Sequence, residues 1–240
     1  MILCLDAGNT RLKYGLFDGS AWRAQGALQH DALDGLLPGL AARPTRIVAC
    51  NVAGDAVRRR IEALAAGLAL PLDWLTGTAA ACGVRNGYDT PQQLGADRWA
   101  ALIGARALHA GACVVVMAGT ATTIDTLDDG GLFRGGLILP GLSLMRAALA
   151  RNTADLPDAA GNYRMQPTNT DDAIVSGAIH ATLGAIERMR ATLAEGALCL
   201  LSGGASVELA PHLDRPHRLI DNLVLEGLAR YSRVAAGIRD

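Results

Sequence analysis

The chain has 240 residues, of which half are hydrophobic and 19% are charged, so it can bury a sizeable core and global disorder is excluded. Its 22 basic and 23 acidic side chains give a net charge of -1, which argues against a surface that binds nucleic acid. The five cysteines are scattered, Asp6 interrupts the first apolar run, and no apolar stretch reaches the length of about 20 residues that a bilayer requires. We therefore expect a cytoplasmic protein with reduced thiols, no signal peptide and no membrane partner.

The chain opens with a predicted β-hairpin. An apolar run over residues 1–5 is followed by the polar turn Asp6-Ala-Gly-Asn-Thr10 and by a second apolar run at residues 12–17. Short apolar runs on either side of a turn that contains glycine are typical of two paired strands.

A strand, a polar loop and a strand recur at residues 114–127. Shifting the first hairpin by 111 positions matches Ala7 with Ala118 and Gly8 with Gly119, and the two copies align without a gap. The repeat predicts a duplicated domain in which each half begins with a hairpin whose turn faces a shared cleft. Chance similarity of two hairpins that contain glycine is the alternative.

Apolar residues at helical spacing predict several helices outside the two hairpins. These helices are expected at residues 55–68, 95–109, 142–150, 171–193 and 221–236. Strands that alternate with helices indicate an α/β fold. We place a boundary near Ala110-Gly111-Ala112, which gives an N-terminal lobe at 1–112 and a C-terminal lobe at 113–240.

The first polar turn has the composition of a phosphate-binding loop. Gly8 lets backbone N–H groups approach phosphate oxygens, and Asn9 and Thr10 add neutral donors. Asp6, at the end of a strand, is placed to hold hydrated Mg²⁺ beside those phosphates, and Lys13 can reach back as a point charge. An ordinary turn is the alternative for this motif taken alone.

Two further loops strengthen this interpretation. The loop Gly119-Thr-Ala-Thr-Thr123 concentrates three hydroxyl groups next to a glycine directly after a buried strand, and with the first loop it predicts a pair of jaws for a polyphosphate. The segment Leu200-Leu-Ser-Gly-Gly-Ala205 follows another apolar strand, and its paired glycines would let an adenine lie against the backbone. A simple turn from strand to helix is the alternative for this last segment.

The order Asp-x-Gly, Gly-Thr, Gly-Gly resembles that of the actin, Hsp70 and sugar-kinase superfamily. The segment Tyr88-Asp-Thr-Pro-Gln-Gln-Leu-Gly-Ala-Asp-Arg-Trp99 is similar to the Tyr…Gly-x-Asp-Arg signature of type III pantothenate kinases. Further similar motifs are Asp6-x-Gly-Asn-Thr10-x-x-Lys13, Gly119-Thr-Ala-Thr-Thr-Ile-Asp125, Gly135-Gly-Leu-Ile-Leu-Pro-Gly141 and Thr170-Asp-Asp-Ala-Ile-Val-Ser-Gly177. The resemblance spans most of the chain.

The resemblance implies duplicated ribonuclease H-like (actin-like ATPase) domains with a cleft between them, and ATP-dependent phosphorylation of pantothenate to 4′-phosphopantothenate in the first step of coenzyme A biosynthesis. It implies that the residues that bind ATP are Asp6, Ala7, Gly8, Asn9, Thr10, Arg11, Leu12, Lys13 and Thr120. It places pantothenate against Tyr88, Gly95, Ala96, Asp97, Arg98 and Thr170, with Asp97 as the catalytic proton acceptor.

Phosphoryl transfer to a primary alcohol independently requires an acceptor for the hydroxyl proton, and a carboxylate such as Asp97 performs this role well. Asp97 lies in the first turn of a predicted helix, so a capping role is the alternative. The guanidinium of Arg98 suits a carboxylate or phosphate, although it could instead pair with the protein.

The chain departs from the family pattern at Met117, where an aspartate associated with a monovalent cation is common. A thioether is a poor ligand for K⁺ or NH₄⁺, so the cation remains an expectation from the family without assigned ligands. The resemblance also implies a homodimer. The alternatives to a pantothenate kinase are a transcriptional accessory factor of the same family and a kinase of another small alcohol.

Overall fold

The computed structural model describes residues 1–36, 40, 42–235 and 237, and it separates the chain into two compact units. The first unit comprises Met1–Ala110, Gly131–Phe133 and Asn222–Asp240, and the second comprises Gly111–Gly130 and Arg134–Asp221. The first unit therefore contains nearly all of the predicted N-terminal lobe, residues 1–112. It also contains the C-terminal segment Asn222–Asp240, which was expected in the other lobe. No helix among these described residues is long and apolar enough to cross a membrane.

A five-stranded sheet forms the centre of the first unit. Its strand order is β3-β2-β1-β4-β5, where β1 pairs antiparallel with β2 and parallel with β4. At the two edges of the sheet, β3 pairs antiparallel with β2, and β5 pairs parallel with β4. The strands are β1 (Ile2–Ala7), β2 (Leu12–Phe17), β3 (Trp22–Leu28), β4 (Arg46–Asn51) and β5 (Leu72–Trp74).

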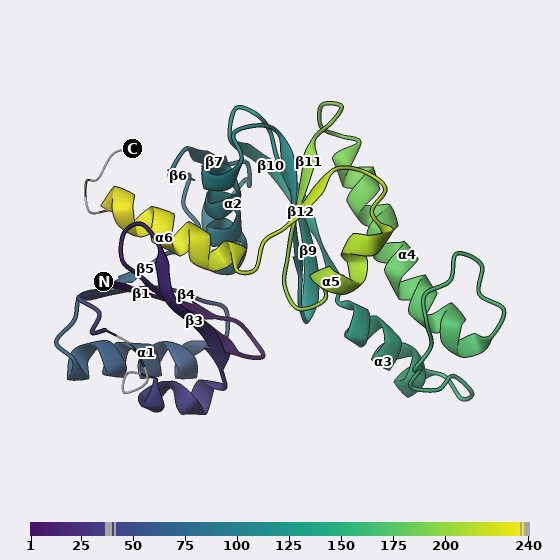
Figure 1. The fold of residues 1–240 in the computed structure, drawn as a ribbon, viewed down its shortest axis with the longest axis horizontal. Coiled ribbons are helices and arrows are strands. Elements are labelled where there is room, and N and C mark those ends of the chain that lie inside the picture. Colours follow the sequence, from purple (N-terminus) through teal and green to yellow (C-terminus); the bar gives the residue numbers. More distant parts are fainter. Residues whose placement is uncertain (37–39, 41, 236, 238–240) are drawn as a thin grey trace. The chain divides into compact units, whose positions relative to one another are not determined.

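Alternation along β1 divides its side chains between two faces of this sheet. Leu3 and Leu5 pack in one core cluster with Val57 and Ile61 of helix α1 (Asp55–Gly67), beside the 3₁₀ helix η1 (His30–Gly35). Asp6 therefore points to the opposite face. Figure 1 shows α1 on one side of the sheet and the yellow helix α6 (Leu223–Ala235) on the other.

Helix α2 (Ala96–Leu108) lies against α6 on that second face, and both helices contact β4. Glycines allow the two helix backbones to approach closely. A Cβ atom on Gly227 would collide with the carbonyl group of Ala100, and one on Gly104 would collide with the carbonyl oxygen of Leu223. This packing explains why the C-terminal segment belongs to the first unit, because its helix covers the face that α2 leaves open.

The second unit repeats the strand order. Its strands run β12-β11-β8-β9-β10, with β8 antiparallel to β9 and parallel to β11, as β1 is to β2 and β4. These strands are β8 (Cys113–Ala118), β9 (Ala121–Leu127), β10 (Leu132–Pro140), β11 (Leu198–Ser202) and β12 (His217–Leu219). The first residues of β10, Leu132 and Phe133, belong to the first unit, where they pair with β7 (Val84–Asn86), which in turn pairs with β6 (Ala80–Ala81).

Helix α4 (Thr170–Arg190) covers the second sheet through Val175, Ile179 and Ile186. Its N-cap is Asn169, whose side chain accepts a hydrogen bond from the Asp172 N–H group. The remaining helical segments are η3 (Pro91–Gln93), α3 (Leu142–Asn152), α5 (Ser206–Leu209) and η4 (Ala210–His212).

The register of the two hairpins corrects one detail of the predicted repeat. Ala7 pairs with Leu12 in the first hairpin, whereas Ala118 pairs with Thr122 in the second. The second loop is therefore one residue shorter, and the gapless match is wrong beyond the loop. Ala7 and Gly8 still match Ala118 and Gly119, because a difference of one residue in loop length leaves the first strand and the start of the loop aligned.

Candidate functional site

Asp6 is a buried carboxylate at the end of β1, and its side chain is only 7% exposed. Its register neighbours are Lys13 on β2 and Cys50 on β4, and the Cys50 thiol donates a hydrogen bond of 3.5 Å to Asp6 Oδ1. Burial is the main cause that raises the pKa of Asp6, Lys13 lowers it, the negative charge of Asp97 raises it and the Cys50 hydrogen bond lowers it, and the net pKa is about 6. The result is an acid that titrates near neutral pH.

Asp97 lies in the first turn of α2, after the N-cap residue Gly95. It is half-buried, and its Oδ1 atom accepts a hydrogen bond of 2.8 Å from the Arg98 N–H group. The carboxylate thus accepts from an amide of its own helical turn but is not the N-cap. Its negative charge raises the pKa of Asp6, so the two carboxylates interact electrostatically within the first unit.

Arg98 is 5% exposed and is held among aromatic rings. Its Nη1 donates a hydrogen bond of 2.8 Å to the Tyr88 hydroxyl, and its guanidinium carbon lies 5.6 Å from the Tyr88 ring centroid and 5.8 Å from that of Phe133. The Tyr88 and Phe133 ring centroids are 5.3 Å apart. In this arrangement Arg98 contacts the predicted substrate residue Tyr88 directly.

The first loop is open where the proposed phosphates would lie. Asn9, Thr10 and Arg11 are exposed and Gly8 is half-buried, whereas Ala7 and Leu12 are buried and could meet a ligand only through their backbone. A Cβ atom on Gly8 would meet only the Arg11 carbonyl oxygen, at an ordinary 3.4 Å. The fold itself therefore does not require glycine here, which leaves close approach of a ligand as a reason for it.

His30 also belongs to this site, although sequence reasoning missed it. Its Nε2 atom lies 2.8 Å from the Gly8 carbonyl oxygen. A single histidine that is not spaced from others as metal ligands are is hard to recognise as functional from the sequence.

The second loop is held by backbone atoms. The Gly141 N–H group donates a hydrogen bond of 2.9 Å to the Thr120 carbonyl oxygen, and the Gly119 N–H donates one of 3.1 Å to that of Ala121. A Cβ atom on Gly141 would collide with the carbonyl oxygens of Gly119 and Thr120. Thr120 itself is exposed, as a residue that contacts a ligand must be.

The third loop has one glycine that the fold requires. Gly203 has a φ of +101°, and a Cβ atom there would collide with the Ala118 carbonyl oxygen at the end of β8. Gly204 is exposed, and a Cβ atom on it would have no neighbour within 4 Å. The turn from strand to helix therefore explains Gly203, and only Gly204 remains open to a ligand.

Met117 occupies the place in β8 that Asp6 occupies in β1. Its register neighbours are Thr123 on β9 and Ser202 on β11, so a row of three neutral side chains crosses the second sheet. The Thr123 hydroxyl is buried and has no partner among the described residues. Hydroxyl oxygens without a carboxylate do not match the ligand set expected for the monovalent cation, so no chemical step is assigned to that ion.

The structure brings most of the predicted residues together in one unit. Asp6, the loop that follows it, Tyr88, Asp97 and Arg98 all belong to the first unit. Thr120 and Thr170 belong to the second, where Thr170 is the exposed first residue of α4.

Comparison with known proteins identifies the family to which the chain belongs. The family model described as type III pantothenate kinase matches residues 2–192. The chain belongs to the type III pantothenate kinase family. A relative of that name from Aromatoleum aromaticum is 55% identical over 97% of this chain and 98% of its own length, and one from Dechloromonas aromatica is 51% identical over 95% and 97%.

Solved structures confirm the predicted fold class. A Campylobacter jejuni protein named as a candidate Baf family transcriptional activator has a TM-score of 0.66 and 21% identity, with 98% of this chain and 99% of that chain covered. A candidate 2-dehydro-3-deoxygalactonokinase from Sinorhizobium meliloti has the same TM-score, 17% identity and the same coverage. The fold is that of the actin-like and sugar-kinase proteins.

Proposed function

We propose that this chain transfers the γ-phosphoryl group of ATP to the primary hydroxyl of pantothenate, which yields 4′-phosphopantothenate and ADP. Membership of the kinase family supplies the reaction class and the use of ATP. The observation that carries the proposal is two carboxylates whose charges interact, Asp6 at the end of β1 and Asp97 in the first turn of α2, together with the exposed loop that follows Asp6. Phosphoryl transfer to an alcohol can use one carboxylate to accept the hydroxyl proton and another to hold a metal ion beside the phosphates.

In this mechanism Asp97 accepts the proton of the attacking hydroxyl. The new bond forms between that oxygen and the γ-phosphorus, the bond from the γ-phosphorus to the β,γ-bridging oxygen breaks, and ADP leaves with the bonding electron pair. The carboxylate is half-buried and accepts a hydrogen bond from the Arg98 N–H, so its orientation is set before the substrate binds. Arg98 in turn holds Tyr88 through the hydrogen bond to its hydroxyl.

Asp6 is the residue that would hold Mg²⁺. Magnesium is often bound through one or two carboxylates together with water and substrate phosphates, so a single buried carboxylate next to the Gly8 loop fits this use. When bound, the ion would neutralise charge on the phosphates. Lys13, the register neighbour of Asp6, would add positive charge on the same face.

Further parts of the proposal follow the family resemblance. The loop from Asp6 to Lys13, with Thr120, would contact ATP. Gly95, Ala96, Arg98, Tyr88 and Thr170 would contact pantothenate. We also propose a cytoplasmic homodimer that responds to K⁺ or NH₄⁺ through ligands other than Met117.

The direct test is to incubate the purified protein with MgATP and pantothenate in the presence of K⁺ or NH₄⁺ and to measure the product by mass spectrometry. We expect a product that is one phosphoryl group heavier than pantothenate, formed in equal amount to ADP. A parallel panel of sugars and other small alcohols should give much less ADP. Release of ADP with a sugar and none with pantothenate would contradict the proposal.

A further inference from the structure

His30 connects helix η1 to the first loop. Its Nε2 atom lies 2.8 Å from the Gly8 carbonyl oxygen, and because a carbonyl can only accept, the hydrogen of the neutral ring must be on Nε2. The backbone ladder ends one residue earlier, where the Val52 N–H donates to the Ala7 carbonyl oxygen at 2.9 Å. His30 therefore anchors the loop one residue beyond the reach of the sheet.

This hydrogen bond also sets the direction of the next amide. The Gly8 carbonyl and the Asn9 N–H belong to the same peptide unit, and in a trans peptide the two groups point in opposite directions. Fixing the carbonyl toward His30 turns the N–H of the exposed residue Asn9 away from it. Backbone N–H groups stabilise an anion best when their orientation is fixed before it arrives.

The corresponding loop of the second unit is held by a backbone amide instead of a side chain. There the Gly141 N–H, at the start of α3, donates to the Thr120 carbonyl oxygen, and no side chain could fit at Gly141. His30 and Gly141 both lie at the start of the helix that follows the third strand of their sheet. A side chain in one copy and a backbone amide in the other thus hold corresponding loops.

We infer that His30 is a positioning residue for ATP: it holds the Gly8–Asn9 peptide so that the Asn9 amide can bind a phosphate oxygen. This inference rests on the proposed function, since it concerns the same loop. A residue that only fastened η1 to the sheet would affect stability without affecting nucleotide binding.

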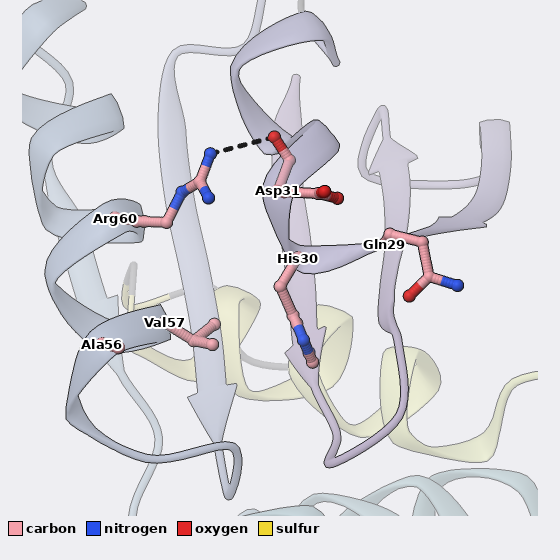
Figure 2. Close-up of a pocket in the computed structure, with 6 residues that line it drawn as sticks. All are labelled: Gln29, His30, Asp31, Ala56, Val57 and Arg60. Carbon is pink, nitrogen blue, oxygen red and sulfur yellow. Dashed lines mark hydrogen bonds between the residues drawn. The ribbon is translucent and has the colours of Figure 1, made fainter.

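A pocket beside His30 makes a selective test possible. It has a volume of about 490 Å³ and lies between η1 and α1, lined by Gln29, His30, Asp31, Ala56, Val57 and Arg60. In Figure 2 the imidazole of His30 points away from Arg60, whose guanidinium donates to the Asp31 carbonyl oxygen at 2.9 Å. Removing the His30 ring would extend this pocket toward Gly8, so a free imidazole could enter and replace the lost donor.

The experiment uses four variants of the full chain. His30→Ala removes the donor and opens the space, His30→Phe removes the donor but keeps the ring volume, and His30→Gln keeps an N–H donor. Gln29→Ala is the matched control, because Gln29 lines the same pocket, is exposed and makes no capping hydrogen bond. ATP affinity is measured by calorimetry and the KM values for ATP and pantothenate by ADP release, all at pH 8.5 with and without imidazole or 1-methylimidazole.

We expect His30→Ala and His30→Phe to weaken ATP binding and raise KM for ATP about five- to tenfold, the effect of one lost hydrogen bond, with KM for pantothenate unchanged within about twofold. His30→Gln should recover most of the affinity, and Gln29→Ala should match the wild type. Imidazole should restore His30→Ala, whereas neutral 1-methylimidazole has no N–H donor and should not.

Unchanged ATP affinity in folded His30→Phe, or equal rescue by both imidazoles, would overturn the inference. Because calorimetry needs no turnover, the result is independent of the acceptor. A wild type that binds ATP without phosphorylating pantothenate would contradict the proposed function and leave the test of His30 intact.

Discussion

The two sheets share a strand order but differ in the row of side chains that crosses them at the end of the first strand. In the first sheet this row is Cys50, Asp6 and Lys13, and in the second it is Ser202, Met117 and Thr123. One row carries two charges and the other carries none. The same backbone framework thus supports an electrostatic site in one copy, while the other copy offers only hydroxyl and backbone groups.

We therefore expect the charged groups that take part in the reaction to lie in the first unit. Burying a carboxylate costs free energy, which the raised pKa of Asp6 records, and a fold tolerates such a cost most readily at a functional site. The second row buries no carboxylate, although the buried Thr123 hydroxyl has no partner among the described residues. The predictions below test whether the charged row and Asp97 carry the function.

The largest expected effect is on turnover. Asp97→Asn should lower kcat by a factor of about 10² to 10⁴, the usual contribution of a general base, with a small change in KM for ATP. Steady-state ADP release measures this. Asp55→Asn is the matched control, because Asp55 also lies in the first turn of a 13-residue helix after a glycine N-cap. Similar losses in both variants would show that Asp97 acts through helix stability.

The next effect concerns stability and its dependence on pH. The pKa of Asp6 rises from an ordinary 3.8 to about 6, so the folded state holds this proton more tightly than the unfolded chain, and stability falls as the pH rises from about 4 to 6. Asp6→Asn should therefore stabilise the metal-free protein at pH 7 by about 2 to 3 kcal/mol, and the gain should vanish below about pH 4. Chemical denaturation across this pH range measures the difference.

Asp18 is a control whose substitution should change the stability in the opposite direction, because its pKa is lowered in the folded state. Hydrogen bonds from the Ala21 and Ser20 N–H groups, and from the Ser20 hydroxyl, hold its pKa below the ordinary value. Asp18→Asn should destabilise the protein at pH 7, and this loss should shrink only as the pH falls below the ordinary 3.8 toward the lower pKa of the folded state. A stabilising Asp18→Asn would show that these hydrogen bonds do not favour the charged carboxylate in the folded state.

A smaller effect distinguishes the glycines. Gly8→Ala should keep the stability of the wild type, because its Cβ would make an ordinary contact, but it should weaken ATP binding about tenfold if phosphates approach the backbone there. Gly141→Ala should instead destabilise the fold, because its Cβ would collide with the second loop. Calorimetric ATP titration and thermal unfolding of both variants separate the two effects.

The sequence predicted the helices well because their apolar faces are regular. The helix expected at 55–68 is Asp55–Gly67 in the structure, and that expected at 95–109 is Ala96–Leu108. Edge strands were harder to predict. For example, β3 alternates between exposed and half-buried residues and has no fully buried one, so it lacks the apolar run that indicated β1 and β8.

The sequence predicted the two hairpin loops and the place of Asp97 in a first helical turn, but not the contacts that hold them. Motifs in one stretch of chain can be matched directly, whereas the contact between His30 and Gly8, and that between Cys50 and Asp6, depend on which strands and helices become neighbours. The place of α6 in the first unit was missed for the same reason. Its apolar face indicated burial but could not identify α2 as the helix against which it packs.

The most direct test of the charged centre is an NMR titration of the Asp6 carboxyl carbon in ¹³C-labelled protein, with Asp97→Asn measured alongside. We expect a pKa of about 6 in the wild type and a lower value in Asp97→Asn, because that substitution removes a negative charge that raises the pKa of Asp6. An Asp6 pKa near its ordinary 3.8 that does not respond to Asp97→Asn would contradict this expectation, since Asp6 would then be neither strongly desolvated nor influenced by the Asp97 charge.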